Sequence, residues 1–211
     1  MIDSHPWEFG TDDERWDAYL VEPGSRTLRN RLGLHDAAAL EKAENDLLEI
    51  RLAELRENPS LIRRSFDLNH LQSLHRYLFQ DVYEWAGDLR SVGLGRGDGE
   101  SFAPPPLISR VVWFATSRIA QSANLRDIPD SDLPHHLAEL YDYLNFAHPF
   151  REGNGRTQRE FFAQLLAESG RGMSWNRVGM SELHSACHIA RNQFDLEPLK
   201  EVLRSALFIE R

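Results

Sequence analysis

Residues 148–159, HPFREGNGRTQR, place a histidine, a carboxylate, a glycine-bracketed asparagine and two arginines three residues apart in one short segment. Pro149 disfavours helical geometry at His148, so a helix should end there. Gly153 and Gly155 permit the positive φ angles of a tight loop. A new helix from about Gly155 or Arg156 would direct unpaired backbone N–H groups and a positive dipole end toward the loop. The segment therefore predicts an anion site.

The side chains around this loop are those needed for phosphoryl or nucleotidyl transfer. Arg156 and Arg159 share one face of the first helical turn, so both can reach one polyphosphate. Glu152 can pair with an arginine or hold Mg²⁺ between phosphates. His148 can take a proton from an incoming hydroxyl. Each residue alone is more often structural, but together they match the base, metal carboxylate, cradle and arginine clamp of such a reaction.

Helices must position this segment. The spacing of apolar residues predicts helices at about residues 36–56, 67–78, 107–124, 132–148, 156–169, 181–193 and 195–208. Asp36 and Asp67 are the expected N-caps of the first two, and Gly170 follows the fifth as a C-terminal cap. On the first helix, a buried stripe is predicted at Leu40, Ala43, Leu47 and Ile50. The expected class is all-α.

Residues 90–103 break the helical pattern. They alternate weakly around Gly97-Asp98-Gly99, which is a hairpin signal. A lone two-stranded ribbon on a helical body is marginally stable by itself. We therefore expect a flap beside the site.

Length and composition limit the number of domains and the kind of protein that this chain can form. The 211 residues, 41% hydrophobic and 27% charged, fit one globular domain over 1–211, with two small domains as the alternative. The acidic N-terminus does not resemble a signal peptide, and no apolar run approaches the roughly 20 residues of a membrane span. With Cys187 as the only cysteine, a cytoplasmic location is expected.

The net charge of −9 argues against broad binding of nucleic acid, which needs a basic face. It does not oppose a phosphorylated small molecule, which a few local arginines can hold.

A second candidate site is a zinc site on the helix near 181–193. His184, Cys187 and His188 lie on one helical face, and a further ligand would have to come from elsewhere, such as His135 or His136. Core packing of Cys187 and a polar helix edge are favoured instead, because the chain has no second paired motif.

The segment 148–159 resembles the Fic motif, usually written H-x-F-x-[DE]-G-N-G-R-x-x-R, at every defined position. Residues 66–90 are similar to the helix and turn that lead into the Fic flap, and residues 28–44 to the family's N-terminal entry. The resemblance covers a core of about 19–208, with 1–18 as an N-terminal extension. It implies a single helical Fic domain with a small β-hairpin flap.

Most Fic proteins transfer AMP from ATP to a hydroxyl side chain of a target protein. The resemblance implies that His148 is the base and that Glu152 holds Mg²⁺ at the α- and β-phosphates. Gly153, Asn154 and Gly155 would line the phosphate loop.

The remaining site residues also follow from the resemblance. Arg156 would hold the β-phosphate region and Arg159 the γ-phosphate, while Phe150 anchors the loop in the core. The flap would align the target by strand addition, with Arg96 and Gly97 near the nucleotide. A phosphorylating relative, Doc, has lysine where this chain has Gly155, so glycine favours AMP transfer.

The resemblance to short bacterial Fic toxins suggests type II topoisomerase subunits as targets. Many Fic enzymes are inhibited by a helix carrying [ST]-x-x-x-E-[GN]. Here Leu40 and Ala53 stand four residues before the Glu-Asn pairs at 44–45 and 57–58, so no internal copy is expected. A separate antitoxin that pairs with Arg159 is the hypothesis. The alternatives are transfer of another nucleotide or phosphoryl moiety, removal of AMP, or a catalytically quiet binding module.

Overall fold

The structure is a computed structural model that describes residues 5–95 and 101–209. These residues are mostly helical, which confirms the all-α class. The eight α-helices among them are α1 (Asp12–Ala18), α2 (Ala37–Glu57), α3 (Leu68–Phe79), α4 (Ile108–Gln121), α5 (Leu133–Ala147), α6 (Asn154–Glu168), α7 (Met180–Gln193) and α8 (Glu197–Ala206). Four short 3-10 helices lie at Pro6–Glu8, Pro59–Leu61, Pro105–Leu107 and Trp175–Arg177.

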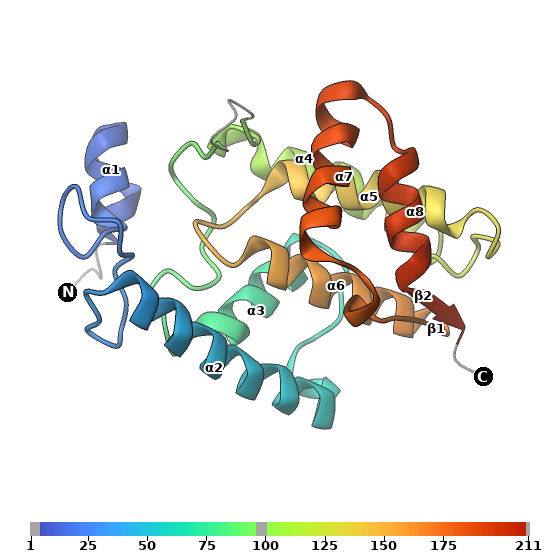
Figure 1. Cartoon of the computed structure of the whole chain (residues 1–211), viewed down its shortest axis with the longest axis horizontal. Coiled ribbons are helices and arrows are strands. Elements are labelled where there is room, and N and C mark those ends of the chain that lie inside the picture. The colour runs from blue at the N-terminus through green and yellow to red at the C-terminus, as the bar shows by residue number, and fades with distance from the viewer. Residues whose placement is uncertain (1–4, 96–100, 210–211) are drawn as a thin grey trace.

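Helix α6 runs through the middle of the molecule, between α3 on one side and α5 on the other (Figure 1). Its side chains Phe161, Phe162, Leu165 and Leu166 are almost wholly buried. Helix α5 in turn packs against α4 and α8. Because α6 begins at the loop of the motif, a buried helix of the core carries the candidate site.

The predicted N-caps of α2 and α3 are present. The carboxylates of Asp36 and Asp67 accept hydrogen bonds from the backbone N–H groups of Ala39 and His70, at 2.8 and 3.0 Å. These are the bonds that satisfy open donors of a first helical turn.

Two predicted helix ends are wrong. Helix α4 ends at Gln121 rather than Asn124, because Ala123, Asn124 and Leu125 adopt positive φ angles of 49°, 57° and 67°. The last helix ends at Ala206 rather than Phe208. The residues after it form strand β2 (Leu207–Ile209), which pairs antiparallel with β1 (Arg171–Met173), a sheet that the sequence did not predict.

The predicted buried stripe of α2 is wrong in part. Leu40 is buried, but Ile50 is 56% exposed. Leu48 and Leu55 are buried instead, together with the acidic residue Glu44. The hydrophobic pattern missed this face because a carboxylate belongs to it, and that carboxylate has partners from distant parts of the chain.

Residues 5–20 pack on the same core as the rest of the chain. Trp7 is 1% exposed and stacks on Tyr19, with ring centroids 5.9 Å apart. The hydroxyl of Ser91 donates to the backbone carbonyl of Trp7. The N-terminal segment therefore lies against the start of the predicted flap.

The predicted flap is described only at its two flanks. Gly95 and Ser101 form an isolated antiparallel bridge, and the N–H of Phe102 donates to the carbonyl of Leu94 at 3.0 Å. These contacts agree with a hairpin. Arg96 and Gly97 lie outside the described residues. Within the described residues, no helix has both the length and the apolar character needed to cross a membrane.

Candidate active site

The loop between α5 and α6 is closed by its own asparagine. The Asn154 side chain accepts from the N–H of Phe150 at 2.8 Å and donates to the carbonyl of the same residue at 2.7 Å. The ring of Phe150 is 1% exposed and anchors the loop in the core. Both bonding groups of the Asn154 amide are therefore engaged in shaping the loop.

The two glycines of the motif differ: Gly153 has the predicted positive φ, whereas Gly155 lies within α6 and does not. Gly153 has φ +78°, and a Cβ there would lie 2.5 Å from the Phe79 ring, so a side chain is excluded on both counts. At Gly155, a Cβ would lie 3.3 Å from Nη1 of Arg159. Glycine at 155 thus leaves the space beside α6 to the second arginine of the motif.

The N-terminus of α6 has the features of an anion-binding element. No side-chain hydrogen bond caps it. The first N–H groups of a helix have no intrahelical acceptor, and the dipole adds a positive field there. The predicted phosphate cradle has this geometry.

His148 ends α5 in a left-handed conformation, with φ 40° and ψ 60°. Its Nδ1 lies 3.2 Å from the carbonyl oxygen of Asn145. Because a carbonyl only accepts, this bond places the proton of a neutral imidazole on Nδ1 and makes Nε2 the nitrogen that can accept a proton. The ring stacks on Phe102 of the flap, with centroids 3.7 Å apart and an interplanar angle of 11°. The imidazole is thus oriented as a base.

A buried arginine joins the flap to this histidine. Arg90 is 2% exposed and donates from Nε to the His148 carbonyl at 2.7 Å. Its other nitrogens donate to the carbonyls of Val92 at 2.7 Å and of Ala103 at 2.5 Å, one on each flank of the flap. Burial lowers the pKa of Arg90 to about 10. Arg90 was not predicted from the sequence to belong to the site.

A buried histidine, His75, contacts the loop through a hydrogen bond and a ring stack. His75 accepts from the N–H of Gly87 at Nδ1 (2.7 Å), so its Nε2 donates to the carbonyl of Glu152 (2.9 Å). The ring also stacks on Phe150, with centroids 3.9 Å apart. Burial lowers the pKa of His75 to about 3. The imidazole is therefore neutral in the folded protein at physiological pH.

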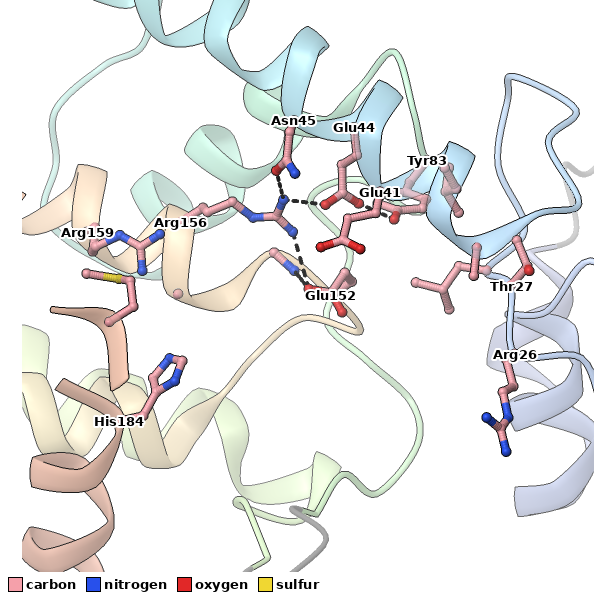
Figure 2. Close-up of a pocket in the computed structure, with 16 residues that line it drawn as sticks. Arg26, Thr27, Glu41, Glu44, Asn45, Tyr83, Glu152, Arg156, Arg159 and His184 are labelled. Atoms are coloured by element: carbon pink, nitrogen blue, oxygen red, sulfur yellow. Dashed lines mark hydrogen bonds and ion pairs between the residues drawn. The ribbon is translucent and has the colours of Figure 1, made fainter. Parts of the chain in front are cut away.

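A cleft of about 500 Å³ opens beside the loop (Figure 2). The motif contributes Glu152, Gly153, Gly155, Arg156 and Arg159 to its wall. The other lining residues are Arg26, Thr27, Leu28, Ala37, Leu40, Glu41, Glu44, Asn45, Tyr83, Met180 and His184. All predicted nucleotide-contacting residues in the described chain line the cleft except Asn154.

The two motif arginines have different surroundings. Arg156 forms ion pairs with Glu44 and with Glu152. No carboxylate among the described residues lies within ion-pair distance of Arg159, and burial lowers the pKa of its guanidinium. Glu44 of the Glu-Asn pair at 44–45 contacts Arg156, the first arginine of the motif, and makes no ion pair with Arg159 in the described structure.

Glu152 fits the role of a Mg²⁺ ligand. Its side chain is 46% exposed at the cleft, and Oε1 accepts from the N–H of Gly153 at 2.8 Å and from Arg156 at 3.3 Å. Magnesium in nucleotide sites is held by one or two carboxylates together with phosphates and water. An accessible carboxylate beside an anion loop fits that donor set.

A second hollow, of about 640 Å³, lies along the flap. Phe102, which stacks on His148, is one of its lining residues, as are Asp12 and Arg15 of α1. His148 therefore lies next to a groove that differs from the cleft of the arginines.

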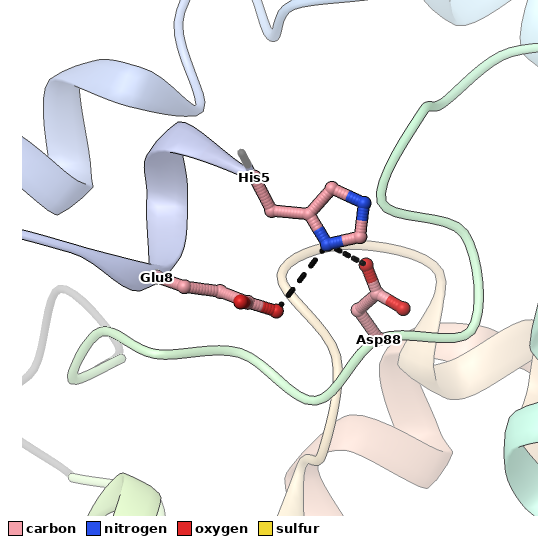
Figure 3. Close-up of side chains that lie close together, drawn as sticks. All are labelled: His5, Glu8 and Asp88. Carbon is pink, nitrogen blue, oxygen red and sulfur yellow. Dashed lines mark hydrogen bonds and ion pairs between the residues drawn. The ribbon is translucent and has the colours of Figure 1, made fainter. Parts of the chain in front are cut away.

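The zinc alternative on α7 gains no support. Within residues 5–95 and 101–209, the one group of three possible ligands is His5, Glu8 and Asp88 (Figure 3). Nδ1 of His5 lies 3.4 Å from Glu8 and 3.8 Å from Asp88, which are ion-pair contacts for a protonated imidazole. These contacts need no metal.

Several residues of the site were not found by sequence reasoning. They are Glu44, Asn45, His75, Tyr83, Arg90, Phe102 and His184. His184 was assigned to a polar helix edge. For Glu44, the sequence did contain a signal: it stands four residues after Leu40 and four before Leu48, so it shares the buried face of α2 with them.

Comparison with known proteins gives the family. The Fic/DOC family model matches residues 65–166. "Protein adenylyltransferase VbhT" of Bartonella schoenbuchensis is 38% identical over 166 residues, covering 79% of this chain and 34% of VbhT, so this chain spans about a third of that relative. A "Probable protein adenylyltransferase Fic" of Salmonella typhimurium is 33% identical, covering 90% of this chain and 92% of the relative.

A solved structure agrees with these relatives. The crystal structure of BepC, a VirB-translocated effector protein of Bartonella tribocorum with bound AMPPNP, superposes with a TM-score of 0.81. The sequences are 25% identical, and the match covers 92% of this chain and 97% of that one. The chain belongs to the Fic/DOC family.

Proposed function

We propose that this protein is an adenylyltransferase that moves AMP from ATP to a hydroxyl side chain of a target protein. The observation that carries the proposal is the oriented base His148 at one end of the anion loop, with Arg156 and Arg159 at the other. The relatives named adenylyltransferases and the nucleotide bound to BepC support the same activity.

The reaction follows from these positions. Nε2 of His148 takes the proton of the target hydroxyl, whose oxygen attacks the α-phosphorus. The bond from the α-phosphorus to the oxygen bridging to the β-phosphate breaks, and pyrophosphate leaves. The α6 N-terminus stabilises charge on the α-phosphate, and Arg156 and Arg159 hold the leaving phosphates. Mg²⁺ held by Glu152 would supply further positive charge to the phosphates.

The test uses two labels. Protein and a bacterial lysate are incubated with Mg²⁺ and ATP labelled either on the α- or on the γ-phosphate. AMP transfer predicts protein labelling from the α-label alone. Labelling from the γ-label would show phosphoryl transfer, and labelling from neither would favour a binding module. Mass spectrometry of the labelled band identifies the modified side chain.

The proposal also covers how a target protein binds and which proteins to test as targets. The groove along the flap supports binding of an extended segment of a target, as in strand addition. Type II topoisomerase subunits, taken from the resemblance to short Fic toxins, are the first targets to incubate with protein and α-labelled ATP.

Since ATP is a cytoplasmic nucleotide, the cytoplasm is the proposed location.

An inhibitory partner is also proposed. Arg159 lines the cleft without a carboxylate partner among the described residues, which supports a separate antitoxin that supplies one. The product of any short neighbouring reading frame should bind the chain and suppress labelling. A protein that is idle by itself, and that gains activity when one of its own residues beside Arg159 is replaced, would argue against a separate inhibitor.

A further inference from the structure

A buried carboxylate faces the nucleotide cleft from α2. Glu44 lines the cleft, yet only 5% of the residue is exposed. A carboxylate in that position is costly unless it is paired and hydrogen-bonded. Its partners therefore show what it does.

Each oxygen of Glu44 has a different partner. Oε2 accepts from the hydroxyl of Tyr83, and Oε1 pairs with Nη1 of Arg156 (Figure 2). Burial, together with the neighbouring Glu44 charge, raises the pKa of Tyr83, so the phenol stays protonated and donates. The carboxylate plane is thereby held from two sides.

The guanidinium of Arg156 is anchored along one edge. Nη1 contacts Glu44 and lies 3.3 Å from Oδ1 of Asn45. The ring of Phe79 lies under the guanidinium carbon, 5.0 Å from its centroid. The other edge, at Nη2, faces the motif loop, where it lies 3.3 Å from Glu152.

We infer that Glu44 is a positioning residue for phosphate binding, which holds Arg156 so that its Nη2 edge faces the β-phosphate. This inference rests on the proposed nucleotide site. A free arginine side chain loses rotamer entropy on binding. The anchor removes that freedom before the nucleotide arrives, and Nη2 is left to exchange Glu152 for phosphate.

The opposite role for the same contact would be a restraint. If Glu44 competed with phosphate for Arg156, its removal would strengthen nucleotide binding. The buried position favours the anchor, because Glu44 is fixed by Tyr83 on the side away from Arg156 and uses only Nη1. The sign of the change in affinity distinguishes the two roles.

The test measures binding of ADP and of AMP, each with Mg²⁺, by calorimetry. Glu44→Gln keeps the size of the side chain and an acceptor for Tyr83 but removes the charge. We expect ADP affinity to fall roughly tenfold, the value of one charge-assisted hydrogen bond, and AMP affinity to stay the same because AMP has no β-phosphate. Asn45→Ala, a surface change, should weaken ADP binding in the same direction by less.

Two comparisons separate positioning from other effects. Glu41→Gln removes the same charge from the same cleft, and among the described residues Glu41 forms no ion pair or hydrogen bond with Arg156. With only repulsion removed, ADP binding should rise slightly. In an Arg156→Ala background, Glu44→Gln should have no further effect on ADP affinity.

Unchanged or stronger ADP binding by Glu44→Gln overturns the inference. So does an equal loss of ADP and AMP with a lowered melting temperature, which would mean a structural role. Wild-type protein that binds neither ATP nor ADP would instead refute the proposed function.

Discussion

The guanidinium of Arg90 donates from Nε to the backbone carbonyl of His148 at a distance of 2.7 Å. The same side chain bonds the carbonyls of Val92 and Ala103, so one buried ion joins both flanks of the flap to the end of α5. Its partners are all neutral carbonyls. The position of the base and that of the flap are therefore coupled.

This coupling predicts the effect of Arg90→Met on stability. The variant leaves several buried carbonyls without a donor, which should lower the free energy of unfolding by roughly 3 kcal/mol or more. Urea unfolding measures it. The control is Arg118→Met, which removes a partly exposed ion pair with Glu139 and should cost under about 1 kcal/mol. Equal losses in the two variants would mean that the Arg90 bonds contribute little.

His148→Ala should abolish AMP transfer and leave ATP binding largely intact. The base acts on the attacking hydroxyl rather than on the nucleotide, and its loss typically costs roughly 10²–10⁴-fold in rate. Labelling with α-labelled ATP and calorimetry with ATP measure the two properties. His135→Ala, an exposed histidine of α5, is the matched control. Transfer at the wild-type rate by the His148 variant would refute its role.

Replacing each of the two motif arginines should weaken the binding of different nucleotides, because we expect each arginine to contact a different phosphate. Arg156→Ala should weaken both ATP and ADP by about 1.5–3 kcal/mol, the range of charge-assisted hydrogen bonds. Arg159→Ala should weaken ATP by a similar amount and ADP much less, since the resemblance assigns it the γ-phosphate. Calorimetry with the two nucleotides gives both differences. Unchanged ATP affinity in either variant would mean that the guanidinium does not reach the phosphates.

Two buried histidines predict a loss of stability in mild acid. Burial lowers the pKa of His75 to about 3 and that of His70 to about 4, from a usual 6.5. Between these values the unfolded chain binds more protons than the folded one, so stability falls as pH falls below about 6.5. Each histidine should lower the free energy of unfolding by roughly 2–4 kcal/mol between pH 7 and pH 4.

Urea unfolding across this pH range measures the loss. His70→Gln should flatten the dependence by about one proton. His35→Gln, at an exposed position, should leave the slope as it is. A slope that is the same in all three proteins would show that His70 is not held neutral by the fold.

The sequence by itself determined the features that depend on local rules. Asp36 and Asp67 cap their helices because a carboxylate at that position meets its own first turn. The motif loop followed from Pro149, Gly153 and the family resemblance, since backbone sterics and the spacing of residues within twelve positions are properties of the chain alone.

Only the tertiary structure decided which distant residues complete the site. Glu44 lies 112 positions from Arg156, and Arg90 lies 58 positions from His148, so no local period connects either pair. Hydrophobic spacing also misassigned part of the buried face of α2, because it cannot recognise a carboxylate that is buried together with its partners. Burial removes water as the competing partner, and a charge then becomes stable only where the fold supplies its counterpart.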